Sequence, residues 1–288
     1  MRVERLDTAR SFLDVTAEYR AAEPLRTNVL ASVATSVADG IATYESAFWW
    51  VMRDGDDVVG AAMRTVPQAL SLGPMPAEAA EALAATYADL DPALPALTGP
   101  RHLVSAFLDR YRPGWSPDGG TVTGEDVHVL YAVEAVRTPE VPGAIEVAAI
   151  EDLDLVERWF VAFDEEVDGI RHARGDDDRA MLAAVVRGGR LRWWRADGRI
   201  VSMAGHAIPI GEPPLKVTRV GPVYTPPEDR RHGYGGAVTA ALSTTLLEGG
   251  SRVMLFADAR NATSNHVYQD LGYERVDEIV RTFLAAPS

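Results

Sequence analysis

Cysteine is absent from this chain of 288 residues. Its absence excludes disulfide bonds, thiolate metal sites and any mechanism in which a cysteine carries a covalent acyl group. Long apolar runs are missing too, and none approaches the roughly 20 residues that a membrane-spanning helix needs. Residues 1–8 carry charge and lack the apolar stretch of a secretory signal. We therefore expect a cytoplasmic protein with no membrane span and no metal site.

Positive charge is scarce. Lysine and arginine number 28 against 42 aspartates and glutamates, so the formal net charge is −14 and the pI is about 4.9. Such a surface repels nucleic acid and anionic membranes, and we expect neither as a partner. It attracts cationic ligands such as amines. Hydrophobic residues make up 47% and charged residues 24%, which is typical of a globular chain of one large domain or two.

A glycine-rich segment in the last third of the chain carries the strongest functional signal. Residues 220–225 are expected to end a strand, and the run Arg230-Arg-His-Gly-Tyr-Gly235 leads directly into a helix over 236–247. Amides at a helix N-terminus bind phosphate, especially where small residues allow close approach. Gly233 and Gly235 remove side chains that would block a diphosphate. The segment therefore predicts a site for a diphosphate-bearing ligand.

Known phosphate-binding patterns differ in how well they fit. A Walker loop needs a lysine after its glycines, and none follows here. A dinucleotide fingerprint needs a third glycine where Val238 stands. The spacing Arg230-x-x-Gly233-x-Gly235 after a strand instead closely resembles the acetyl-CoA signature Arg/Gln-x-x-Gly-x-Gly/Ala of the GNAT superfamily of N-acetyltransferases.

A second motif follows in the order that this superfamily has. After the strand expected over 253–257, Asn261 precedes a helix that contains Asn265 and Tyr268, and Gly272-Tyr273 ends it. Asn265 and Tyr268 are three residues apart and share a helix face. The resemblance to the GNAT pattern Asn-x6-Tyr-x3-Gly-Phe/Tyr covers residues 217–284 together with the first motif.

An internal repeat indicates two similar halves. Residues 48–67 parallel 192–209: each has an aromatic strand, an Asp-Gly turn and a strand of small and β-branched residues. We infer an α/β (α+β) fold of two tandem GNAT-like mixed-sheet domains with helices on both faces. Residues 1–138 would form a degenerate structural domain without the phosphate motif, and 139–288 the acetyltransferase domain, joined by a Pro/Gly-bearing linker over 137–143.

In the second half the residue pattern predicts an ordered series of elements. These are a strand over 144–150, a helix over 151–163, a helix over 179–187, a hairpin over 190–208, a strand over 216–224, a helix over 236–247, a strand over 253–257, a helix before Gly272, and a last pair of strands within 275–284.

The resemblance implies acetyl-CoA as the acetyl donor. The strand end would pair with its pantetheine arm, and the loop amides would hold its diphosphate. The residues implied for this contact are Val223, Tyr224, Thr225, Arg230, Arg231, His232, Gly233, Tyr234, Gly235, Gly236, Asn261 and Asn265. Asn261 is equally well placed to cap the helix that follows it.

Tyr268 is the candidate catalytic acid, because a phenol with a pKa about 10 is protonated at neutral pH and can protonate a departing thiolate. The base is not identified by the sequence. Glu165 and Glu166, within the acidic run 164–168, and His206 on the hairpin are candidate substrate contacts.

These observations predict direct acetyl transfer to a primary amine of a small molecule or peptide, by a monomer or homodimer. The acceptor is left open: a polyamine or amino sugar, an antibiotic amine, an amino-acid-like metabolite or a protein N-terminus, with a longer acyl-CoA as a further donor. The alternative is a non-catalytic acyl-CoA-binding or scaffold module. A nicotinamide-binding fold is disfavoured by Val238.

Overall fold

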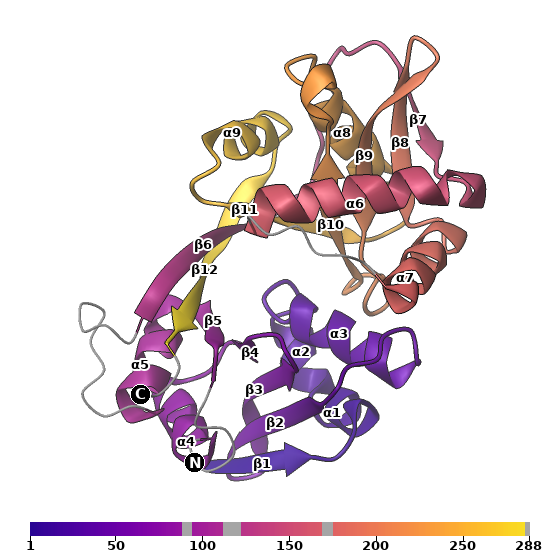
Figure 1. The fold of residues 1–288 in the computed structure, drawn as a ribbon. Coiled ribbons are helices and arrows are strands. Elements are labelled where there is room, and N and C mark those ends of the chain that lie inside the picture. The colour runs from indigo at the N-terminus through magenta and orange to yellow at the C-terminus, as the bar shows by residue number, and fades with distance from the viewer. Residues whose placement is uncertain (88–93, 112–121, 169–174, 286–288) are drawn as a thin grey trace. The chain divides into compact units, whose positions relative to one another are not determined.

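The computed structural model of the chain describes residues 1–87, 94–111, 122–168 and 175–285 (Figure 1). Two compact units share the chain, and neither is one continuous segment. The first comprises residues 1–130, 257–261 and 276–288, and the second comprises 131–256 and 262–275. The C-terminal strand thus returns to the first unit. The functional division at residue 138 stays a prediction.

The first unit is built on one mixed sheet. Its strands are β1 (Arg2–Leu6), β2 (Ala47–Asp54), β3 (Asp57–Thr65), β4 (Leu70–Leu72), β5 (Ala96–Pro100), the part of β12 (Glu274–Leu284) from Val276 onward, and β6 (Val122–Val133) as far as Leu130. They lie in the order β1-β2-β3-β4-β5-β12-β6. The helices are α1 (Ala9–Val15), α2 (Ala17–Ala22), α3 (Asn28–Ala38), α4 (Ala77–Tyr87) and α5 (Arg101–Tyr111).

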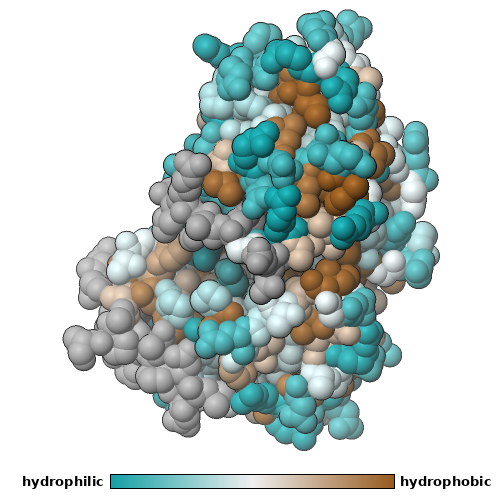
Figure 2. All heavy atoms as spheres, turned by 45° about the vertical axis from the view of Figure 1, so that its right-hand side comes forward, coloured by the Kyte–Doolittle hydropathy of each residue, from teal (hydrophilic) through white to brown (hydrophobic). Residues whose placement is uncertain are grey.

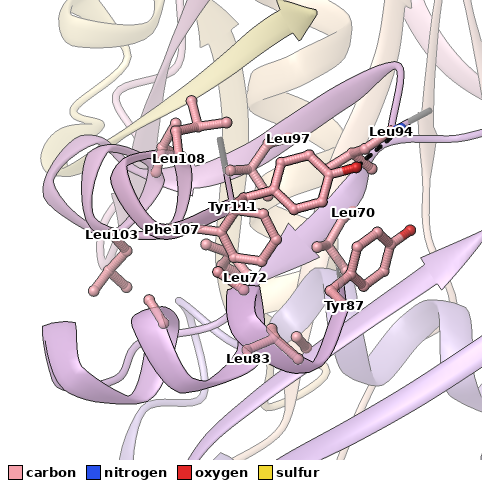
Figure 3. Close-up of a cluster of buried hydrophobic side chains, with 14 of the residues drawn as sticks. Leu70, Leu72, Leu83, Tyr87, Leu94, Leu97, Leu103, Phe107, Leu108 and Tyr111 are labelled. Atoms are coloured by element: carbon pink, nitrogen blue, oxygen red, sulfur yellow. Dashed lines mark hydrogen bonds between the residues drawn. The ribbon is translucent and has the colours of Figure 1, made fainter. Parts of the chain in front are cut away.

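Helices cover both faces of this sheet, as the sequence predicts. Successive residues of a strand point to opposite faces, so the adjacent Trp49 and Trp50 enter different cores. Trp49 packs with Phe12 of α1, and their ring centroids are 5.2 Å apart. Trp50 packs with Tyr87 of α4 at 5.4 Å. Figure 3 shows the second core, where the hydroxyl of Tyr111 accepts a hydrogen bond from the backbone N–H of Leu94.

The second unit contains the remaining strands of the 12-stranded sheet and has its own helices. Its strands lie in the order β11-β10-β9-β8-β7, and only the β10–β11 pair among them is parallel. The bounds are β7 Ala144–Val147, β8 Leu191–Ala196, β9 Arg199–His206, β10 Val217–Tyr224, β11 Arg252–Asp258, α6 Leu153–Asp168, α7 Asp176–Arg187, α8 Tyr234–Glu248 and α9 Ala262–Asp270, with 3₁₀ turns at Ile150–Asp152 and Pro227–Asp229.

α6 and α7 cover one face of the strands of the second unit. The core between them includes alternate residues of these strands. Leu191, Trp193, Met203 and Tyr224 pack with apolar residues of α6 and α7. α8 packs against β8, β9 and β10. The strand residues that alternate with the residues of the α6–α7 core face α8. The face toward α6 and α7 and the face toward α8 are therefore distinct surfaces of one sheet, which matters for the site below.

Some expected element bounds need correction. The predicted pair of strands within 275–284 is a single strand, β12, because the sequence there has no Gly or Pro to turn the chain. Residues 279–283 of β12 pair antiparallel with residues 96–100 of β5, at sequence separations of 179 to 187 residues. The helix predicted over 236–247 begins two residues earlier, at Tyr234, and the first predicted helix of the second half extends to Asp168.

No helix within the described residues is both long and apolar enough to cross a bilayer. On the face in Figure 2, hydrophilic side chains (teal) predominate, and apolar ones (brown) gather in patches between them. The large apolar side chains that are exposed are Met1, Ile41, Val147, Ile150, Val167, Met181 and Leu215.

Candidate functional site

Strand β10 separates from its parallel neighbour halfway along its length. The ladder to β11 joins Val217–Val220 to Arg252–Leu255, whereas β10 continues to Tyr224. On the other side, the register with β9 shifts between Val220 and Val223, which marks a bulge. Gly221, with φ +141°, lies in it. One edge of residues 221–224 is thus outside the ladder to β11, and its backbone groups can pair with an extended ligand.

The glycine-rich loop follows β10 and opens into α8. Gly233 takes the N-cap position with φ +80°, and no side chain caps the helix. The first amides of α8 therefore lack a side-chain acceptor, which leaves them for an anion. A Cβ at Gly233 would lie 2.9 Å from Val141 Cγ2, and one at Gly235 would lie 3.2 Å from Thr225 Oγ1. A side chain at Gly233 would press on Val141 and one at Gly235 would crowd Thr225, so glycine suits both positions.

The base of this loop is fixed by a charged contact. The Asp229 carboxylate is buried and accepts a hydrogen bond from Arg199 on β9 at 3.0 Å. Ser202, also on β9 and buried, donates to the Tyr224 carbonyl at 3.0 Å and lies 2.8 Å from the hydroxyl of Thr225. The strand end and the loop are thereby held to the sheet.

The first arginine of the motif turns away from the loop amides. Arg230 Nε donates to the Thr225 carbonyl at 2.9 Å, and its guanidinium also forms an ion pair with Glu166 of α6. Its charged carbon lies 6.0 Å from the centre of the Tyr224 ring. Arg230 thus ties the end of β10 to α6.

The other two basic residues of the loop are exposed. The His232 ring stacks on Tyr234 at 5.4 Å, and its Nδ1 lies 3.2 Å from the Asp229 carbonyl. Arg231, with φ +64°, makes no ion pair or side-chain hydrogen bond with the described residues. Among Arg230, Arg231 and His232, Arg231 therefore has the fewest side-chain contacts within the described residues, and its guanidinium is available to a phosphate.

Tyr268 lies in α9 between two other tyrosines. Its ring centroid is 6.4 Å from that of Tyr131 and 6.0 Å from that of Tyr273. The Tyr273 hydroxyl is 2.6 Å from Ser243 Oγ, and the Tyr131 hydroxyl donates to Asn265 Oδ1 at 2.9 Å. The Tyr268 hydroxyl, in contrast, has no hydrogen bond to the described part of the chain. Desolvation by the surrounding protein raises the pKa of its phenol to about 12.

The two asparagines of the second motif have different surroundings. Asn265 joins α9 to Tyr131 through the hydrogen bond above, so its amide also has a structural role. Asn261 is exposed and directly precedes α9, and its backbone N–H donates to the Asp258 carbonyl at 3.0 Å. It belongs to the first compact unit, whereas α9 belongs to the second.

The candidate substrate contacts also lie in different places. Glu166 stands beside the loop through its ion pair with Arg230. Glu165 next to it is exposed and makes no ion pair or hydrogen bond with the described residues. His206, at the end of β9, is opposite Val220 beside the bulge. Burial lowers the pKa of His206. Its Nδ1 is 2.8 Å from the Ala207 carbonyl, so Nε2 is the ring nitrogen that does not take part in this contact.

Sequence reasoning missed Ser202 and Tyr131. Only the pairing of Tyr224 with Met203 brings Ser202 to the strand end, and Tyr131 comes from the end of β6, more than 130 residues before Tyr268. Neither residue stands in a motif that could have indicated its place. Such contacts are non-local, so no local pattern encodes them.

Comparisons with known proteins agree with this geometry. The family described as FR47-like protein matches residues 213–282, which include β10, the loop, α8, β11 and α9. No curated protein matches the chain. Among solved structures, a GNAT-family acetyltransferase from Colwellia psychrerythraea is 10% identical with a TM-score of 0.60, covering 99% of this chain and all of that one.

Two further structures are similar over nearly the full length. A tandem GNAT protein from the clavulanic acid biosynthesis pathway is 16% identical with a TM-score of 0.57 and covers 100% of both chains. A GCN5-related N-acetyltransferase from Sphaerobacter thermophilus is 13% identical with a TM-score of 0.58, covering 99% of this chain and 97% of that one. The chain therefore has the tandem GNAT fold that the sequence predicts.

Proposed function

We propose that this protein, which has a tandem GNAT fold, is an acetyl-CoA-dependent N-acetyltransferase that acts on a primary amine. The observation that carries the proposal is the uncapped N-terminus of α8, where Gly233 has φ +80°, beside the part of β10 that is outside the ladder to β11. The two features together suit a ligand with a diphosphate and an extended arm.

The second unit supplies groups for each part of the donor. The amides of residues 233–236 would bind the diphosphate, with Arg231 beside them. The free edge of residues 221–224 would pair with the pantetheine arm. Acetyl-CoA supplies an acetyl group activated as a thioester.

Tyr268 would act as the acid. As nitrogen bonds to the acetyl carbon and the carbon–sulfur bond breaks, Tyr268 Oη gives its proton to the departing sulfur. A pKa about 12 keeps this phenol protonated at neutral pH. A base must take the proton of the amine, and His206 and Glu165 are the candidates. His206 can accept it at Nε2, because its Nδ1 lies at the Ala207 carbonyl. Glu165 is a candidate because Arg230 pairs with Glu166 and not with Glu165.

The first unit offers no comparable space at the corresponding turn. After β4, a Cβ at Gly73 would lie 2.4 Å from the Tyr19 hydroxyl, which donates to the Pro74 carbonyl at 2.7 Å. A tyrosine thus fills the region beside the start of α4, and this supports one donor site per chain.

Calorimetric titration with acetyl-CoA, followed by an amine panel assayed for release of free CoA, tests the proposal. We expect one site per chain and acetylation of a subset of amines. Two sites would contradict the degenerate first half. Binding without turnover of any amine would favour the alternative, a non-catalytic acyl-CoA-binding module, and absence of binding would overturn both.

A further inference from the structure

The side chain of Arg219 on β10 has no partner within the part of the chain that the structure describes. Its guanidinium makes no hydrogen bond or ion pair with the described residues, although the residue is partly buried. Its backbone carbonyl accepts a hydrogen bond from the Ala207 N–H at 2.9 Å. Four other arginines of the same unit pair with carboxylates: Arg179 with Asp154 and Glu157, Arg195 with Glu146, Arg199 with Asp229, and Arg230 with Glu166.

An unpaired guanidinium in this position has a free-energy cost. Arginine keeps its charge at all ordinary pH values, and a charge removed from water is costly unless an opposite charge or hydrogen bonds offset the loss. Burial lowers the pKa of Arg219. Acidic residues are abundant in the chain, at 42 against 28 basic ones. The Arg219 guanidinium therefore remains available to a ligand of opposite charge.

The strand register decides which face Arg219 occupies. Residues directly opposite in an antiparallel pair point to the same face. Leu191 belongs to the α6–α7 core and is opposite Gly205, so His206 faces the other side, as does its partner Val220. Arg219 precedes Val220 and thus points to the face that α6 and α7 cover.

The position along β10 places Arg219 next to the opening in the sheet. It lies in the last paired stretch with β11, opposite Met254, and two residues before Gly221. The proposed donor arm would lie along residues 221–224. An acceptor that approaches the end of this arm from the α6–α7 face would meet the Arg219 guanidinium.

Two other partly buried arginines of this unit do not share the location. Arg190 and Arg192 also have a pKa lowered by burial, but both act on the pKa of His206 and lie on the opposite face. Arg192 donates to the Leu191 carbonyl at 3.2 Å. They are therefore matched controls for Arg219.

We propose that Arg219 binds a carboxylate of the acyl acceptor, so that the substrate class is an amine that also carries a carboxylate, such as an amino acid or ω-amino acid. This inference rests on the proposed acetyltransferase function. The planar guanidinium suits a carboxylate, because it can donate two parallel hydrogen bonds to its two oxygens. A simple polyamine has no carboxylate, so its binding would not need an arginine at this position.

Matched pairs of acceptors test the assignment. Glycine, β-alanine and 4-aminobutyrate would each be compared with its carboxamide, which keeps the amine and removes the negative charge. We expect the wild type to favour the acids in kcat/KM. Arg219→Met should lower kcat/KM for the acids about 10- to 100-fold, the range for hydrogen bonds to charged groups, and leave the amides unchanged.

Three control measurements separate this role from a structural one. Arg190→Met removes a partly buried arginine from the opposite face and should leave the acid-to-amide ratio as in the wild type. Arg219→Lys keeps the charge without the planar fork and should retain part of the preference. The affinity of Arg219→Met for acetyl-CoA should equal that of the wild type, which shows that the donor site is intact.

Two results would overturn the proposal: equal use of acids and amides by the wild type, or an equal loss for both in Arg219→Met. If no amine is acetylated, the acetyltransferase proposal fails, and thermal unfolding with acetyl-CoA present still tests the carboxylate site. A stabilisation by β-alanine, absent with its amide and absent in Arg219→Met, would support the site. No stabilisation by any of the acids would refute it.

Discussion

The rings of Tyr268 and Tyr273 meet edge to face with centroids 6.0 Å apart, yet their hydroxyls differ in role. The Tyr273 hydroxyl is buried against Ser243 at 2.6 Å. The Tyr268 hydroxyl makes no hydrogen bond with the described residues. The Tyr273 hydroxyl is thus engaged with α8, whereas the Tyr268 hydroxyl is not engaged by the described residues.

The first prediction concerns this difference. Tyr268→Phe should lower kcat about 100-fold, since general acids commonly contribute that much, and should leave acetyl-CoA affinity unchanged. Tyr273→Phe is the matched control: it should cost about 1 kcal/mol of unfolding free energy for the lost hydrogen bond and retain kcat. Steady-state kinetics, calorimetry and urea unfolding measure the three quantities. Equal kcat in Tyr268→Phe and wild type would remove Tyr268 from the mechanism.

The second prediction compares two glycines with left-handed backbones. Gly233, in the loop, has φ +80°, and Gly198, in the β8–β9 turn, has φ +74°. Replacing either with alanine adds backbone strain of about 1–2 kcal/mol. Only Gly233→Ala should also weaken acetyl-CoA binding, because its Cβ would meet Val141 and displace the amides of the loop. If the two variants lose affinity equally, the effect comes from instability and the loop assignment is wrong.

The third prediction concerns the Arg230–Glu166 ion pair, whose side chains are 41% and 47% exposed. Released from this pair, Arg230 would be able to turn toward the loop amides and a diphosphate bound there, so Glu166→Gln should strengthen acetyl-CoA binding by up to about 5-fold, the range of exposed pairs. Glu165→Gln removes the same charge one residue away and should change the affinity less. A weaker affinity in Glu166→Gln would show that the pair supports the loop instead.

The fourth prediction is a pH dependence of stability. Burial lowers the pKa of His206 below its ordinary value of 6.5. Below pH 6.5 the unfolded chain binds a proton that the folded chain does not, so this contribution to stability is present above 6.5 and is lost as pH falls through the lower folded value. His206→Gln should therefore reduce the difference in urea midpoint between pH 7.5 and pH 5.5.

The control for this experiment is His266→Gln on α9, where the side chain is 76% exposed and lies 3.3 Å from Asp270. The wild-type difference between the two pH values should persist in this variant. If His206→Gln keeps the full difference as well, groups other than His206 cause it.

Local patterns of the sequence predicted much of the fold. The Asp-Gly turns, the alternating strands and the glycine loop each lie within a few residues, so the hairpins β2–β3 and β8–β9 and the start of α8 near Gly233 could be expected. The C-terminal segment was harder. β12 is one long strand whose partner is β5, far away in the chain, and no local signal encodes such a pairing.

The sequence by itself determined the tandem fold and the motif that would bind a diphosphate, because both depend on residue spacing within single elements. Only the tertiary structure decided which groups are available at the site. It paired Arg230 with Glu166, tied Asn265 to Tyr131, and left the side chains of Tyr268 and Arg219 without hydrogen-bond partners among the described residues. These outcomes depend on contacts between segments distant in the chain, where burial and geometry, not residue type, decide whether a polar group is bonded or remains free for a ligand.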